Sequence, residues 1–299
     1  MKMRFLAVAL FLLGIVCLAQ QSSAQLTMTG VGGGFGAAAS YTGPGDIQTF
    51  AFWGGWRCYS NAYSGNAVDV WDAATGSTIE TLLTCSPGGT LNQTIHTLAT
   101  TCASGCVVKT IYDQTGNGHD TTQATNSDRP NVVANAINSS YCMQGHTSGP
   151  PLLPGASAYT QSQPYSAVGI SKFGTANYGV FSITDGSFGG FIVQYNNLAT
   201  TLIFYAGGSV SATVTNAFHV WQVVFNGASG IYNIDGSDTT GQNFGSNSLT
   251  TSQTLGIYNG SGNGPSDAIV CEVGYVAGSI STGNRAALNT NMHAAYGGF

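Results

Sequence analysis

The stretch His219-Val-Trp-Gln-Val-Val-Phe-Asn-Gly-Ala-Ser-Gly-Ile-Tyr-Asn-Ile-Asp-Gly236 decides the fold class of this chain. It contains two short runs rich in β-branched and aromatic residues, His219–Phe225 and Gly230–Ile234. The first run is followed by Asn226-Gly227 and the second by Asp235-Gly236, which are turn signals. Short runs of this kind, separated by such pairs, are typical of antiparallel strands joined by tight turns.

The same pattern extends to both sides of this stretch. From Ile47 onward, short apolar or alternating runs are broken by clusters of Gly, Asn, Asp and Ser. No linker divides the middle of the chain, so we predict one all-β sandwich domain over residues 46–299. The other expected strands are Ala67–Trp71, Val107–Tyr112, Tyr178–Ile183, Phe191–Tyr195, Leu202–Tyr205, Thr254–Ile257 and Ala268–Val276.

Two segments have the 3.6-residue period of a helix instead. The first would begin near Thr90, which is a suitable cap. The second would begin at Ser281 or Asn284 and end at Gly297-Gly298. The apolar stripe of the first is Leu91, Ile95, Leu98 and Cys102, and that of the second is Leu288, Met292 and Tyr296.

The N-terminus has the pattern of an export signal. Lys2 and Arg4 precede the apolar run Phe5–Leu18, and small residues lead up to Ala24. We predict a signal peptide over residues 1–24 and a flexible Gly-rich leader over residues 25–45. A transmembrane anchor is the alternative, but the run is shorter than the roughly 20 residues that a bilayer requires. We therefore expect a secreted protein with no membrane partner.

The composition limits the classes of partner. Residues 25–299 contain five basic residues and twelve acids, a net charge of about −7, and only 6% of the chain is charged. Five scattered basic residues cannot follow a phosphate backbone, so we expect no nucleic acid partner. The sequence has no phosphate loop and no dinucleotide fingerprint, so we expect no cofactor. We expect a monomer.

Six cysteines follow the expected signal peptide. An even number in an exported chain favours disulfides. Zinc is the alternative, but the close pair Cys102 and Cys106 has no second pair or histidine cluster to complete a tetrahedral site. The pairing of the other four is left open by the sequence. These are Cys58, Cys85, Cys142 and Cys271.

One segment resembles a known family. The run from Cys102-Ala-Ser-Gly-Cys106 through Ile111-Tyr-Asp-Gln-Thr-Gly-Asn-Gly-His119 to Thr122-Gln-Ala124 is similar to the catalytic domain of α-L-arabinofuranosidase B, glycoside hydrolase family 54. Cys58-Tyr-Ser-Asn-Ala-Tyr-Ser-Gly65 resembles the opening of the same domain, and the second half resembles lectin and laminin-G sandwiches. The resemblance implies a concanavalin A-like jelly roll, a Cys102–Cys106 disulfide and action on arabinose-containing polysaccharide.

The family's two catalytic carboxylates have no counterpart at the matching positions. Its nucleophile strand matches Gly190–Gln194, and its acid loop matches Tyr258–Ser261; neither segment contains Asp or Glu. A retaining glycosidase needs two carboxylates about 5–5.5 Å apart. Asp185 and Asp267 flank the two segments, and we take them as the candidate catalytic pair. The alternative is that both acids make local bonds in turns.

Aromatic and amide side chains are the candidate sugar-binding residues. Sugar rings stack on aromatic faces, while their hydroxyls pair with amides. We select Trp53, Trp56, Tyr258 and Asn259, with core packing as the alternative for each aromatic. If the catalytic pair is absent, the alternative function is a lectin-like module that binds a polysaccharide or glycan, or a structural or adhesive protein with no sugar site.

Two other polar features have structural interpretations. Asp113-Gln-Thr-Gly-Asn-Gly-His-Asp120 offers oxygens for calcium, but an Asx-type turn is the favoured interpretation, and we predict no metal. Glu272 lies in an apolar strand, and we expect it to bond to a neighbouring loop. The histidines form no recognisable catalytic group.

Overall fold

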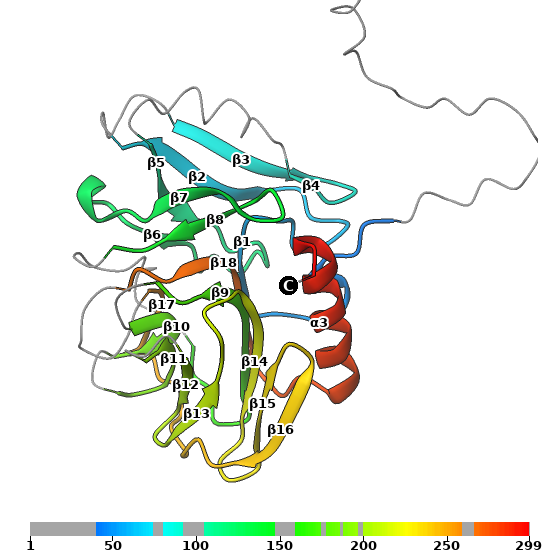
Figure 1. The fold of residues 1–299 in the computed structure, drawn as a ribbon, viewed down its shortest axis with the longest axis vertical. Coiled ribbons are helices and arrows are strands. Elements are labelled where there is room, and N and C mark those ends of the chain that lie inside the picture. Colours follow the sequence, from blue (N-terminus) through cyan, green and yellow to red (C-terminus); the bar gives the residue numbers. More distant parts are fainter. Residues whose placement is uncertain are drawn as a thin grey trace, which may run out of the picture. The chain divides into compact units, whose positions relative to one another are not determined.

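The computed structural model describes residues 40–73, 80–91, 105–146, 159–174, 178–185, 188–196, 200–258 and 266–298. These belong to one compact unit that begins at Ser40. They form two antiparallel sheets and one long helix, α3 (Figure 1). The β-sandwich expected from the sequence is confirmed.

The larger sheet contains 13 strands within the described residues, in the order β16-β15-β14-β9-β18-β8-β7-β5-β2-β3-β4, with β1 beside β18 and β6 beside β5. Strands far apart in the sequence meet at its centre, where β18 lies between β8 and β9. Its strands are β1 (Phe52–Gly55), β2 (Asn66–Asp72), β3 (Glu80–Ser86), β4 (Thr90–Leu91), β5 (Cys106–Ile111), β6 (Thr121–Thr122), β7 (Asn131–Ile137), β8 (Ser140–Gln144), β9 (Tyr165–Lys172), β14 (His219–Phe225), β15 (Gly230–Ile234), β16 (Ser237–Gln242) and β18 (Ile269–Val276).

The smaller sheet has five strands within the described residues, in the order β13-β12-β11-β10-β17. The register pairs Phe181 of β10 with Val193 of β11, and Val193 with Phe204 of β12. These three side chains are buried, so they share the face that packs on the larger sheet. The strands are β10 (Tyr178–Thr184), β11 (Phe191–Tyr195), β12 (Thr201–Tyr205), β13 (Ser209–Thr213) and β17 (Thr254–Ile257).

Aromatic side chains fill the space between the sheets. Phe191 of the smaller sheet stacks on Phe225 and Tyr275 of the larger sheet, with ring centroids 5.2 Å and 6.0 Å away. Burying each such side chain stabilises the fold by roughly 1.5–3 kcal/mol. The period-2 alternation of the strands produces this layer because every second side chain points to the same face.

A second core lies between the larger sheet and α3 (Thr282–Tyr296), which is the red helix beside β14 in Figure 1. Ser281 caps the helix by accepting a hydrogen bond from the Asn284 N–H, and Gly297 ends it at φ 86°. The predicted helix and both its ends are confirmed. Because β14 lies between the two cores, the whole run His219–Phe225 is buried.

Two disulfides join residues that are distant in the sequence. Cys58 is bonded to Cys85, and Cys142 to Cys271. Cys106 is also disulfide-bonded, while its expected partner Cys102 lies outside the described residues. The expectation of disulfides is thus confirmed for two pairs.

Several expectations fall on other parts of the chain. The signal peptide (1–24), most of the leader and residues 92–102 of the first expected helix lie outside the described residues. The expected start of that helix, Thr90-Leu91, is strand β4 instead. At the end of the leader, Gly43 and Pro44 are already buried, and the Gly45 N–H donates to Tyr59 O at 2.7 Å. The folded domain therefore includes residues 43–45. In the described ranges, α3 is too short and too polar to span a bilayer, and no other helix qualifies.

His219 makes the stability of the domain depend on pH. Its Nδ1 lies 2.6 Å from Asp235 Oδ2, and its Nε2 lies 3.1 Å from Thr215 Oγ1. Burial alone would lower the pKa of His219, but the hydrogen bond and charge of Asp235 outweigh burial and raise it. Because the pKa of His219 is higher in the folded state, its protonated form stabilises the fold. This contribution is complete below the unfolded-state pKa of about 6.5, and it is lost as the pH rises through the folded-state pKa.

We therefore predict a larger free energy of unfolding at acidic pH than at alkaline pH from this contribution. Urea unfolding across this window measures it, with His219→Asn as the control that removes the titrating group. The difference between wild type and His219→Asn should shrink as the pH rises. A constant difference at all pH values would contradict the assignment.

Candidate functional site

The segment Asp113–Asp120 is a turn that positions the first strand. Asp113 Oδ1 accepts hydrogen bonds from the Thr115 N–H at 3.0 Å and the Thr115 hydroxyl at 2.7 Å, and Asp113 Oδ2 accepts one from the His119 N–H at 3.1 Å. The Asp113 N–H donates to Asp120 Oδ1 at 2.8 Å. Within the ranges that the structure describes, no group of metal-ligating side chains could hold an ion. The Asx-type turn is the arrangement observed.

Gln114 connects the Asp113–Asp120 turn to the segment around Cys58. Its Nε2 donates to Gly55 O at 3.2 Å and Arg57 O at 3.0 Å, while its Oε1 accepts from the Tyr59 N–H at 2.8 Å. Only 1% of Gln114 is exposed, so three buried backbone groups depend on one amide. The motif that carries the family resemblance therefore has a structural role in this chain, since it holds the backbone of residues 55–59 in place.

Glu272 is structural, as expected. It is fully buried on β18, and its carboxylate meets Arg57 in two bonds, Nε–Oε2 at 2.5 Å and Nη2–Oε1 at 2.8 Å. Burial raises the pKa of Glu272, and Arg57 offsets this only in part. Burial would lower the pKa of Arg57, but Glu272 outweighs it, so the Arg57 pKa lies above its ordinary value. The fork geometry is that of an ion pair.

The structure places the three candidate stacking aromatics in the core. Trp53 has no exposed surface and packs on Phe50 at 4.8 Å in the second core. Trp56 is 6% exposed and Tyr258 is 2% exposed. The Tyr258 hydroxyl donates to Met143 O at 2.6 Å. None of these rings presents a face to solvent, and Asn259 lies outside the described residues.

The candidate catalytic acids lie at opposite ends of β10. Asp185 directly follows β10, is exposed, and accepts a hydrogen bond from the Gly189 N–H at 3.0 Å. Asp267 precedes β18 and packs beside Gly174, close to where β10 begins. A seven-residue strand spans about 20 Å. This placement keeps the two carboxylates well beyond the separation of about 5–5.5 Å that a retaining pair requires.

The two strands associated with the family's catalytic positions are β11, which contains most of Gly190–Gln194, and β17, which precedes Tyr258. β11 and β17 both pair with β10, so they are separated by two strand spacings, about 10 Å. On the outer face of these strands, Ser182 lies between Ile192 and Gly256. Ser182 is fully buried, and its hydroxyl has no hydrogen-bond partner. A buried polar group without a partner is unusual. Ser182 itself has no exposed surface, so the part of this face that is open to a ligand lies beside it, at the half-buried Gln194 of β11 and Tyr205 of β12.

An aromatic pair borders the same face. Tyr205 of β12 lies opposite Ile192, and its ring meets that of Phe188 edge-on with centroids 5.5 Å apart. Phe188 is 48% exposed and has φ 66°, a strained value for a bulky residue. Asn247 Nδ2 donates to Phe188 O at 2.8 Å and helps to hold this loop. Sequence patterns missed both aromatics, because one lies in a turn and the other ends an ordinary strand.

The smaller sheet is uncharged. None of its five strands contains Asp, Glu, Lys, Arg or His. The five strands can therefore offer hydroxyl, amide and aromatic contacts, and they contribute no carboxylate.

Two facing antiparallel sheets define a β-sandwich, to which a C-terminal helix is added. Among solved structures, the chain is similar to an arabinofuranosidase complexed with arabinofuranosyl-α-1,2-xylobiose, with 14% identity and a TM-score of 0.66 over 85% of this chain and 65% of that one. It is also similar to a variant of a GH54 α-L-arabinofuranosidase soaked with 4-nitrophenyl α-L-arabinofuranoside, with 16% identity and a TM-score of 0.66 over 85% and 66% of the two chains.

The matched region spans just under two thirds of each of those chains. At such identities the likeness shows a shared fold, which is the one that the sequence resemblance implied. The sequence matches no family model and no curated protein.

Proposed function

We propose that this chain is a secreted, monomeric, lectin-like protein that binds arabinose-containing polysaccharide without hydrolysing it. The proposed site is the outer face of β11 and β12 around Gln194 and Tyr205, together with the exposed Phe188. The observation that carries the proposal is the complete absence of charged side chains from the five strands of the smaller sheet.

An uncharged face suits an uncharged ligand. Neutral sugars present apolar C–H faces and hydroxyls, so they need ring faces for contact and hydroxyls or amides for hydrogen bonds. Phe188 and Tyr205 supply the rings, and Gln194 supplies an amide on the same side of the sheet. The sugar ligands in the similar structures lend support by analogy of fold. Export is supported by the apolar N-terminal run and the disulfides.

Hydrolysis is the second candidate, favoured by the arabinofuranosidase identity of the similar structures. It would require Asp185 and Asp267 to act together. Their positions at the two ends of β10 argue against this. The binding proposal therefore takes precedence.

The first test is binding. The purified full chain should be retained on an arabinan column, and Phe188→Ala and Tyr205→Ala should each weaken its affinity about tenfold, the loss expected for one aromatic contact of about 1.4 kcal/mol. Leu82→Ala is the matched control, since Leu82 is 39% exposed on β3 of the other sheet. Full retention by both aromatic variants would rule out this face, provided all variants unfold at the wild-type temperature.

The second test is turnover. We expect no release of 4-nitrophenol from 4-nitrophenyl α-L-arabinofuranoside by the wild type. Turnover by the wild type that is lost in both Asp185→Asn and Asp267→Asn would establish the hydrolase instead. Turnover that survives in both variants would reject the binding-only proposal and this choice of acids together.

A further inference from the structure

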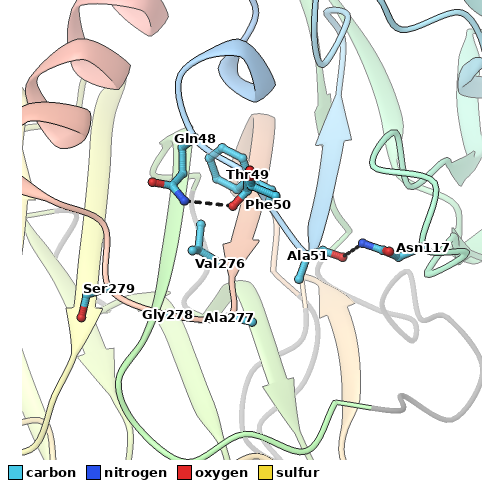
Figure 2. Close-up of a pocket in the computed structure, with 9 residues that line it drawn as sticks. All are labelled: Gln48, Thr49, Phe50, Ala51, Asn117, Val276, Ala277, Gly278 and Ser279. Carbon is cyan, nitrogen blue, oxygen red and sulfur yellow. Dashed lines mark hydrogen bonds between the residues drawn. The ribbon is translucent and has the colours of Figure 1, made fainter.

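A pocket of about 470 Å³ opens beside the larger sheet, away from the strands of the proposed site (Figure 2). Its walls are two chain segments, residues 48–51 before β1 and residues 276–279 at the end of β18, with Asn117 at one side. No lining residue belongs to the smaller sheet. The volume lies within the range of about 300–1,000 Å³ that small-molecule sites occupy.

Both walls are held by hydrogen bonds from other parts of the fold. Ala51 O accepts from Asn117 Nδ2 at 2.9 Å and from the Tyr159 hydroxyl at 3.0 Å, and the Ala51 N–H donates to Tyr275 O at 2.8 Å. Across the pocket, Gly278 O accepts from the Ser166 hydroxyl at 2.7 Å. A ligand would therefore meet a preformed site and would not have to order a loop.

The chemistry of the lining is that of a neutral, hydroxyl-rich site. None of the nine lining residues is charged. Gln48 is already engaged, since its Nε2 donates to Thr49 O at 3.0 Å and its Oε1 accepts from Asn284 Nδ2 at 2.9 Å. Within the described residues, the hydroxyls of Thr49 and Ser279 make no hydrogen bond to the protein. Each hydroxyl can both donate and accept, as the hydroxyls of a sugar require.

An ionic ligand would be poorly served here. Tight anion sites usually contain cationic side chains, and divalent-cation sites usually contain carboxylates, and none of the nine lining side chains is charged. We infer that this pocket is a second carbohydrate site, which receives one uncharged sugar residue between the Thr49 and Ser279 hydroxyls. The inference goes beyond the proposed function, because it uses no residue of the sheet face.

The test is an NMR titration of the isotope-labelled full chain with L-arabinose and, separately, with α-1,5-linked arabinotriose. We expect saturable shifts of the Ala51 and Gly278 amides. Thr49→Val and Ser279→Ala should each raise the Kd at these amides about two- to tenfold, since each removes one hydroxyl. Ala277→Trp should abolish the shifts, because an indole at this exposed position would fill the pocket.

The controls separate the two sites. Phe188→Ala should leave the shifts at Ala51 and Gly278 unchanged, whereas Ala277→Trp should leave arabinan retention through the sheet face unchanged. Unsaturable shifts with both sugars, or saturable shifts that persist in Ala277→Trp, would overturn the inference. An unchanged unfolding temperature in Thr49→Val and Ser279→Ala confirms that the loss of binding is local.

Discussion

Replacement of Glu272 by glutamine should lower the free energy of unfolding by about 3–5 kcal/mol. The change leaves the Arg57 guanidinium, whose side chain is only 10% exposed, without its counter-charge. Water cannot solvate the Arg57 charge in place of the carboxylate, since Glu272 has no exposed surface. Urea unfolding of the full chain, followed by tryptophan fluorescence, measures the loss.

A double variant distinguishes an uncompensated charge from lost packing. The double variant Arg57→Met/Glu272→Leu removes both charges. It should recover most of the stability lost in Glu272→Gln, because apolar side chains of similar volume often replace a buried ion pair at no cost. Arg57 also donates to Asn291 Oδ1 at 2.5 Å, so part of the loss should persist. A double variant as unstable as the sum of its two single variants would contradict the ion-pair account.

The strands that are short, mostly apolar runs were predictable from the sequence. Phe191–Tyr195, His219–Phe225, Gly230–Ile234 and Thr254–Ile257 have the predicted bounds. Each combines β-branched or aromatic residues with a clear turn signal, so local sequence was sufficient.

The central strand β9 shows where local sequence was insufficient. Serine and glycine interrupt its apolar pattern. The glycine is required by a distant residue, because a Cβ at Gly169 would lie 2.4 Å from Trp221 Cζ2. Such a contact between two strands is invisible before their register is known. The edge strand β16 was missed for a different reason, since its mostly exposed residues need no apolar alternation.

The candidate site was only partly predictable for the same reason. The resemblance identified β11 and the end of β17, which the structure places on either side of β10. Trp53 was a candidate sugar-binding residue, with core packing as the alternative, and the structure favours the alternative. Gly54 and Gly55 allow close packing of β1 on its neighbours, and Trp53 faces the second core. The partner of Glu272 lies 215 residues away in the sequence, and only the fold reveals it.

Loss of the Cys142–Cys271 disulfide should destabilise the protein by about 4–5 kcal/mol, more than the about 3–4 kcal/mol expected for Cys58–Cys85. The difference comes from the entropy of the unfolded chain. Cys142–Cys271 closes a loop between residues 129 apart, whereas Cys58–Cys85 closes one between residues 27 apart. A longer loop removes more conformational entropy from the unfolded state. Cys142→Ala with Cys271→Ala, and Cys58→Ala with Cys85→Ala, isolate the two bonds in urea unfolding.

The two paired variants also test the arrangement of the cores. Cys142 and Cys271 are fully buried in the second core, where β8 meets β18. Their loss should therefore weaken the packing beneath α3 as well as increase the entropy of the unfolded chain. Hydrogen exchange in α3 should therefore rise in the Cys142/Cys271 variant and stay near the wild-type rate in the Cys58/Cys85 variant at equal overall stability. Equal losses of stability in the two variants, with α3 unaffected in both, would show that neither loop length nor the second core governs the effect.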